Sequence, residues 1–289
     1  MVEWLGRCPY GRWFLRRAVS ALVRGRGEHA LNRRAACLLL LVPFLSGCAG
    51  DGWHIVDPRT AEGWGNLSFL MAGAGLTLGL SATALLLAIG IGLLTAIARS
   101  SRWRLLRMTS GAYVELMRTL PLFVLLLWVF YALPILVQGL APDSVGFRAL
   151  GWIADLTPFA AALIALALNA GAFLSEIFRA GIEGVPKGQV EAAQSLGMGR
   201  WLTLRRIILP QALRRMLPPT VGQFIHTVKD SSLASAIGLA ELTRRATELQ
   251  TQTYRPLELY TLLALEYLVI LLILSRLSRW LERRWGQAV

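Results

Sequence analysis

The sequence predicts an all-α integral membrane protein with a five-helix core and an additional apolar segment near its N-terminus. Of the 289 residues, 55% are hydrophobic and only 16% are charged, with a mean hydropathy of +0.53. A typical soluble domain has about 25% charged residues. The apolar residues also gather in long runs, and a helix needs roughly 20 mostly apolar residues to cross a bilayer core. These two observations argue against a soluble enzyme.

Five apolar runs fit membrane-spanning helices. The first three each contain an uncharged stretch long enough to cross a bilayer. The fourth is interrupted by Lys229 and Asp230, and the fifth contains Glu266. The expected spans are about 70–98, 119–141, 156–178, 217–240 and 259–277. Together they define a membrane domain over residues 67–285.

The N-terminal 50 residues stand apart from this domain. Residues 1–34 are rich in arginine, which predicts a cytoplasmic location, and residues 35–50 form an apolar run of marginal length for a span. The run ends in Leu45-Ser46-Gly47-Cys48, which resembles a lipoprotein cleavage site and would place a lipid on Cys48. An uncleaved signal anchor, an extra transmembrane segment and a misassigned start codon are the alternatives. We therefore exclude this segment from the fold core.

The distribution of basic residues predicts the orientation of the spans. If residues 1–34, 99–110, 179–215 and 276–289 are on the inner side, that side holds 23 of the 30 Lys and Arg, against 5 in the outer loops. Inner loops are enriched in Lys and Arg in bacterial membrane proteins. This topology also accounts for most of the net charge of +13 without a nucleic-acid partner.

The sequence lacks the common signatures of catalytic and metal sites. It contains no phosphate-binding Gly-x4-Gly-Lys-Ser/Thr loop, no Gly-x-Ser-x-Gly nucleophile motif and no His-Glu-x-x-His zinc motif. Its three cysteines and three histidines are scattered, without metal-binding spacing. We expect no catalytic residue, no metal and no cofactor in this chain.

The long inner loop after the third span carries the most specific pattern. Small and glycine residues near Gly197 and Gly199 predict two short helices separated by a sharp turn. Trp201, Leu204 and Ile208 recur at helical spacing and predict one apolar face, and Pro210 is expected to break the helix. The periodicity alone fits equally a protein-docking element and an interfacial helix lying on anionic lipid.

This loop resembles the coupling loop of bacterial ABC importer permeases. The family pattern E-A-A-x3-G-x9-I-x-L-P is matched at every position, by Glu191, Ala192, Ala193, Gly197, Ile207, Leu209 and Pro210. The segment 181–210 is similar to the polar amino-acid branch of the family, and 115–122, 229–233 and 237–245 match further. The resemblance covers roughly residues 67–285. The long N-terminus departs from the family pattern.

The resemblance implies a transport subunit, not an enzyme, in the bacterial inner membrane. It would work as a homo- or heterodimer with a second permease, and a periplasmic solute-binding protein would deliver a polar amino acid. A separate ATPase subunit would bind ATP and magnesium and dock on the coupling loop, residues 186–215. There Gly197 would supply the turn, Glu191 a polar contact and Ala192-Ala193 close packing. A secondary transporter driven by ions or protons is the alternative, although it leaves the complete coupling motif unexplained.

Polar residues inside apolar spans are candidates for the substrate path. Lys229 and Asp230 could face the carboxylate and ammonium groups of an amino acid, or form a neutralised contact at a dimer interface. Asn169 could line the path or serve helix packing. Glu266 is expected to face protein or water, not lipid.

Other residues in the spans indicate helix contacts. Glu115 with Arg118, and Glu176 with Arg179, are spaced for local ion pairs near span ends. The small-residue repeat Gly75-x3-Gly79 indicates close helix packing in the first span.

Overall fold

The computed structural model describes residues 51–139 and 151–285, and every regular element in these two ranges is helical. The predictions for residues 1–34, residues 35–50 and Cys48 lie outside the described residues. The elements in chain order are η3 (Asp51–Val56), α3 (Ala61–Arg99), α4 (Arg104–Thr119), α5 (Leu122–Leu127), η4 (Trp128–Ala132), α6 (Leu133–Gln138), η5 (Gly151–Ile153), α8 (Pro158–Glu183), α9 (Lys187–Ser195), α10 (Arg200–Thr203), η6 (Leu204–Ile208), α11 (Leu209–Asp230), η7 (Ser231–Ile237), α12 (Leu242–Thr253) and α13 (Pro256–Trp285).

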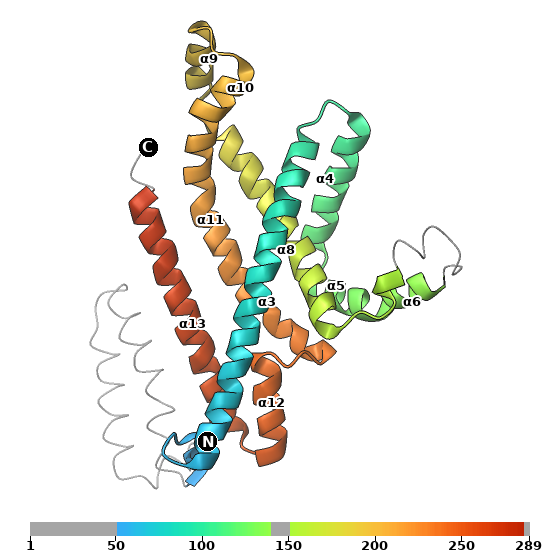
Figure 1. Cartoon of the computed structure of the whole chain (residues 1–289), viewed down its shortest axis with the longest axis vertical. Coiled ribbons are helices and arrows are strands. Elements are labelled where there is room, and N and C mark those ends of the chain that lie inside the picture. Colours follow the sequence, from blue (N-terminus) through green and yellow to red (C-terminus); the bar gives the residue numbers. More distant parts are fainter. Residues whose placement is uncertain (1–50, 140–150, 286–289) are drawn as a thin grey trace, which may run out of the picture.

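Helices α3 and α8 form the centre of the fold (Figure 1). Each begins at a threonine whose hydroxyl accepts a backbone N–H, Thr60 from Gly63 and Thr157 from Ala160. Gly92 lets the two backbones approach closely, because a methyl group there would lie 2.9 Å from Cβ of Leu174. This contact fixes the inner half of α3 against α8.

The repeat Gly75-x3-Gly79 makes no close contact with another described helix, in contrast to the packing expected of it. Both glycines are exposed, and a methyl group on either would meet nothing within 4 Å. The repeat lies on the outward face of α3, whereas Gly73 and Gly92 lie on the packed face.

Three described helices, α3, α8 and α13, are long and apolar enough to cross a bilayer. Helix α3 begins at Ala61, before the expected span 70–98, because Thr60 caps it there. Leu70 and Ala74, within the expected span, are buried against α12. Helix α3 is 39 residues long, so at 1.5 Å per residue it reaches roughly 58 Å, well beyond a bilayer core.

The second expected span, 119–141, is not one straight helix. Helix α4 and the run Leu122–Gln138 meet at an angle of 107°. The bend is at Leu120 and Pro121, which are extended with ψ values of 130° and 129°. Proline disfavours helical backbone in the preceding residue, so a helix ends there. Helix α4 was not predicted from the sequence, because its arginines assigned its first half to the inner loop 99–110. If α4 and the run Leu122–Gln138 are counted together as one bent span, they are a fourth candidate for crossing the bilayer.

The fourth expected span, 217–240, corresponds to α11, which ends at Asp230, followed by the 3-10 turn η7. Lys229 and Asp230 therefore lie at the end of α11, not in the middle of a span. Pro210 does not break the helix as expected. It lies where the π-helical turn η6 passes directly into α11, and the helix continues through it.

The described parts of the expected inner loops, within 99–110, 179–215 and 276–285, lie at the same end of the molecule. Figure 1 places α9 and α10 at one extremity, where the α3–α4 turn also lies, and the C-terminal end of α13 points the same way. The opposite end holds η3, α12 and the beginning of α13. This arrangement agrees with the orientation predicted from the basic residues.

Candidate functional site

The candidate coupling loop is built around a left-handed turn at Gly197, with φ of +78°. The N–H of Gly197 donates to the carbonyl of Gln194 at 2.9 Å, and the N–H of Met198 donates to that of Ala193 at 3.0 Å. This pair of bonds is the Schellman arrangement that ends helices at glycine. The two short helices and the turn between them are as the sequence predicts.

The second half of the loop differs from the expected amphipathic helix. Helix α10 has four residues and passes into the π-helical turn η6. Because a π turn contains more residues than an α turn, it rotates the following side chains. Trp201, before this turn, is 72% exposed, whereas Ile208, at its end, packs inward against the base of the loop. Trp201 and Ile208 therefore do not lie on the one apolar face that the periodicity predicts.

The base of the loop is anchored on α8 and α11. The partly buried Val190 and Ile208 pack against a buried apolar cluster formed by Phe178, Val185, Ala212 and Met216, with further residues of α3 and α8. The side chain of Gln211 in α11 donates to the side-chain carbonyl of Gln189 in α9 at 2.5 Å. These contacts connect the loop mechanically to two long helices.

The tip of the loop presents an exposed apolar and basic surface. Leu196 is 83% exposed and Trp201 72%, whereas Ala193 is only 4% exposed and packs inside the loop. Glu191 and Ala192 are exposed, as are three arginines, Arg200, Arg205 and Arg206. The tip also stands away from the other helix ends (Figure 1). Large exposed apolar side chains in such a position indicate an interaction surface, for a protein or for the membrane.

A network of charged residues joins α3 to α8 at the inner end. Glu176 contacts Arg99 of α3 and Arg179 of its own helix, the latter at 2.7 Å, and Arg179 reaches Glu183 at 2.7 Å. The predicted pair Glu176–Arg179 is thus confirmed and extended. Partly exposed pairs of this kind contribute at most about 1 kcal/mol each.

The predicted pair of Glu115 with Arg118 is wrong within the described part of the chain. The Arg118 guanidinium lies over the ring of Phe173 instead, 5.5 Å from its centroid. Glu115 is exposed and forms no ion pair with a described residue.

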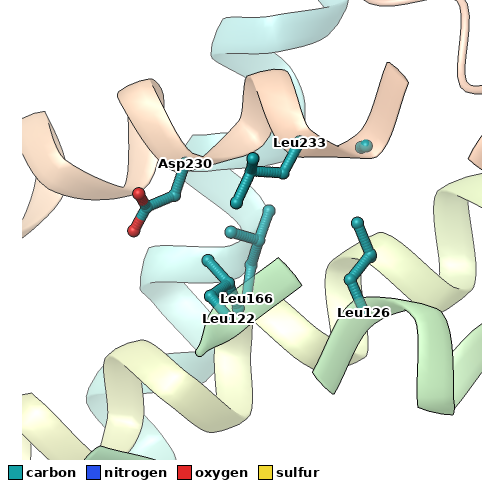
Figure 2. A pocket seen from close by; sticks show the side chains of 6 residues that line it. Leu122, Leu126, Leu166, Asp230 and Leu233 are labelled. Carbon is teal, nitrogen blue, oxygen red and sulfur yellow. The ribbon is translucent and has the colours of Figure 1, made fainter. Parts of the chain in front are cut away.

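Asp230 borders a small recess between α5, α8 and η7. The recess is otherwise lined by apolar side chains, those of Leu122, Leu126, Leu166, Leu233 and Ala234. Figure 2 shows the Asp230 carboxylate at its margin, beside Leu233 and Leu166. Asp230 is thus the one charged side chain lining this recess.

The other two substrate-path candidates do not lie with Asp230. Lys229 is exposed and does not line the recess. Asn169 is 8% exposed, and its amide donates to the carbonyl of Met117 at 2.9 Å, which joins α8 to α4. The geometry gives Asn169 a packing role and leaves only Asp230 at the recess.

A buried polar cluster of Glu241, Thr77 and Tyr267 lies at the outer end, and the sequence analysis did not predict it. Glu241, fully buried, accepts hydrogen bonds from the backbone N–H of Arg244 at 2.8 Å, from the Tyr267 hydroxyl at 3.1 Å and from the Thr77 hydroxyl at 3.4 Å. The cluster ties α12 to α3 and α13. Burial raises the pKa of Glu241 despite these bonds, which lower it. The sequence did contain a signal for part of this cluster: Glu241 directly precedes α12, a position where an acidic side chain commonly caps a helix.

Glu266 faces protein, as expected, because both its carboxylate oxygens are buried without a hydrogen-bond partner in the described part of the chain. Among the described residues, no group of His, Cys, Asp and Glu is arranged to hold a metal ion.

Comparison with known proteins gives a consistent result. The family described as binding-protein-dependent transport system inner membrane component matches residues 88–287. The chain is 38% identical over 221 residues to the glutamine transport system permease protein GlnP of Escherichia coli K12, covering 76% of this chain and 94% of GlnP. It is 40% identical over 200 residues to the L-cystine transport system permease protein TcyB of Bacillus subtilis 168, covering 69% of this chain and 79% of TcyB.

A solved structure, that of an amino acid ABC transporter with histidines, is also similar. It has a TM-score of 0.66 and 35% sequence identity, over 75% of this chain and 94% of that chain.

Proposed function

Because the chain belongs to the family of binding-protein-dependent transport system inner membrane components, we propose that it imports polar amino acids from the periplasm into the cytoplasm. It is the permease subunit of an ATP-driven importer in the bacterial inner membrane. The observation that carries this proposal is the complete coupling motif, Glu191 to Pro210, on a projecting loop with an exposed apolar tip. The substrate class is supported by relatives named for glutamine and cystine transport.

A separate ATPase subunit, which binds ATP and magnesium, docks on the loop 186–215. Leu196 and Trp201 offer apolar area for a groove on that subunit, and Glu191 offers a polar contact beside them. Buried aromatic anchors of this kind dominate the energetics of many protein interfaces. Gly197 holds the turn that presents them, and Ala193 fills the interior of the loop.

Movement of the loop reaches the membrane through its base. The apolar cluster at the base and the Gln189–Gln211 contact connect the loop to α8 and α11. A packed connection of this kind transmits a displacement instead of absorbing it, since interiors are close-packed. Nucleotide binding on the ATPase would thereby bias the spans between outward-facing and inward-facing arrangements.

Asp230 is the preferred contact for the ammonium group of the substrate. It is the charged residue of the recess, and its neighbours there are apolar. In this arrangement of the helices the recess is too closed to admit a water molecule, so the spans have to separate before an ammonium group can reach it. An ammonium ion is attracted more strongly to a carboxylate in surroundings of low polarity than in water. Lys229, which is exposed outside the recess, remains a candidate contact for the carboxylate group of the substrate. Asn169 is a less favoured substrate contact, because its amide already bonds to Met117.

A second permease, identical or related, completes the membrane part. Only 6% of the apolar window of Pro256–Leu281 is buried within this chain, and Gly75 and Gly79 are also exposed. These surfaces are available to the second permease or to lipid.

The Gly197→Asp variant tests the coupling role. We expect it to abolish uptake while its amount in the membrane stays the same. The turn has open space around it, and aspartate is one of the residues that most readily adopts a positive φ, so the strain from the new side chain is small and the main change is a charge in the docking surface. Uptake of labelled glutamine in intact cells, and immunoblotting of the membrane fraction, measure the two quantities.

Gly197→Asn is the matched control, because asparagine tolerates the left-handed turn and carries no charge. We expect it to retain much of the uptake. Normal uptake by Gly197→Asp would refute the coupling assignment. Uptake that persists after deletion of the ATPase gene would instead favour an ion- or proton-driven carrier.

A further inference from the structure

Tyr254 occupies an unusual position at the outer end of the molecule. It lies in the two-residue connection between α12 and α13, with φ of +55° and ψ of +32°. Its backbone N–H donates to the carbonyl of Gln250 at 2.8 Å and so ends α12. The tight connection requires a left-handed residue at this point.

Tyrosine is a costly choice for such a position. The left-handed region brings Cβ too close to the backbone, so helix ends of this kind normally use glycine or asparagine. The two other described residues with a comparable positive φ, Gly197 and Gly238, are both glycines. Tyr254 is the single exception among the described residues.

The tyrosine side chain does not compensate for this strain within the chain. Its residue is 81% exposed. The side chain makes no hydrogen bond or ring contact with another described residue. Strained residues persist where structure or function maintains them, and they are concentrated at binding sites. The side chain is therefore expected to act on something outside the chain.

The surroundings of Tyr254 resemble a small protein-docking surface. Leu257 is 64% exposed and Arg255 is exposed, with only a loose contact of 3.8 Å to Glu258. The exposed polar residue Gln252 borders them. Tyrosine and arginine are enriched among residues that dominate binding energy, and a polar rim commonly surrounds them.

We infer that Tyr254, with Arg255 and Leu257, forms a docking point for the solute-binding protein. This inference rests on the proposed function, since transport in this family depends on a binding protein. The segment lies beside α12, at the end opposite the coupling loop (Figure 1), where the solute must arrive.

A membrane-anchoring role would not require the strain. Tyrosines anchor helices at the bilayer interface from ordinary helical backbone. Tyr260, which is 42% exposed in the second turn of α13, already has such a position. A second permease also explains the position less well, because the exposed residues here are flanked by polar side chains and not by a continuous apolar face.

The test uses the complete importer, with its ATPase and binding protein, in proteoliposomes. The Tyr254→Gly variant relieves the strain and removes the side chain. We expect the binding-protein concentration that half-maximally stimulates ATP hydrolysis to rise about tenfold. The thermal midpoint of the variant should equal or exceed that of the unaltered protein, and its basal ATP hydrolysis should be unchanged. Tyr254→Asn should behave in the same way.

Tyr260→Ala is the matched control and should leave the half-maximal concentration unchanged. An unchanged concentration for Tyr254→Gly would overturn the inference, as would an equal increase for Tyr260→Ala. A lower thermal midpoint of Tyr254→Gly without a docking defect would also overturn it and indicate a lipid anchor. If the unaltered importer shows no stimulation by its binding protein, the proposed function fails, and the docking point with it.

Discussion

Asp230 and Asn169 are both polar residues in largely apolar surroundings, but their environments differ. The amide of Asn169 has a backbone carbonyl of a neighbouring helix as its partner. The carboxylate of Asp230 borders a recess lined by leucine and alanine side chains. A satisfied amide between two helices fits a structural role, whereas a carboxylate at the margin of an apolar recess is suited to a ligand.

The two residues are therefore expected to respond differently to substitution. Asn169→Ala should lower stability by about 1–2 kcal/mol, because it leaves the buried carbonyl of Met117 unpaired, and should retain substrate affinity. Asp230→Asn should retain stability and raise the substrate concentration for half-maximal uptake at least about tenfold, through loss of an ionic contact. Thermal unfolding in detergent and concentration-dependent uptake measure these effects. Equal substrate affinity for Asp230→Asn and the unaltered protein would exclude the ammonium contact.

At the scale of the elements, the packing of α3 on α8 depends on which face of α3 carries a glycine. Gly92 faces α8, and a methyl group there would lie 2.9 Å from Cβ of Leu174 and 3.1 Å from the carbonyl oxygen of Gly171. Gly90, two residues earlier, has nothing within 4 Å of the same position. The two glycines thus form a matched pair in one helix.

Gly92→Leu is expected to lower the free energy of unfolding by about 1–3 kcal/mol, because the added side chain forces the two helices apart. Gly90→Leu should change it little, since its side chain enters open space. Thermal denaturation of the purified variants in one detergent provides the comparison. A similar loss in both would show that glycine matters here for a reason other than the α3–α8 contact.

Hydropathy predicted α3, α8 and α13 well because each contains one long apolar stretch. It predicted α4 and α11 poorly because both carry several charges and depend on neighbouring helices for their burial. The bend at Pro121 left a signal in the sequence, but its angle of 107° is set by tertiary packing that local patterns do not contain.

The coupling loop could be predicted further than the substrate path. Its turn depends on local backbone preferences, and Gly197 expresses these directly in the sequence. The recess at Asp230 is formed by side chains from helices far apart in the chain. No spacing rule relates such residues. The sequence therefore identified Asp230 as a candidate for the substrate path but gave no reason to prefer it to Asn169 or Lys229.

For the whole molecule, the orientation in the membrane follows from two opposite ends. One end carries the coupling loop and most of the basic residues that the structure describes, and the other carries α12 and the segment with Tyr254 (Figure 1). Positive charges are retained on the cytoplasmic side during membrane insertion. The tip of the loop should therefore be reached only from the cytoplasm.

Single cysteines at exposed positions test this orientation in a background where Cys8, Cys37 and Cys48 are replaced by serine. Trp201→Cys should react with a membrane-impermeant maleimide only in inverted membrane vesicles. Tyr254→Cys should react only in intact spheroplasts. The opposite labelling pattern would reverse the orientation and remove the basis of both docking assignments.

Because α10, η6 and α11 are continuous, they form one long helical segment that connects the coupling loop to Asp230. From Arg200 to Asp230 the backbone runs without a non-helical break, and at about 1.5 Å per residue it reaches roughly 45 Å. The first end of this continuous helix belongs to the loop tip on which an ATPase would dock, and its last residue, Asp230, lies beside the recess. A tilt of this helix about its packed base at Ala212 would move Asp230 farther than the tip, because Asp230 lies 18 residues from Ala212 and Arg200 lies 12 residues from it. Flexing at Pro218 and Pro219, inside α11, would reduce that movement.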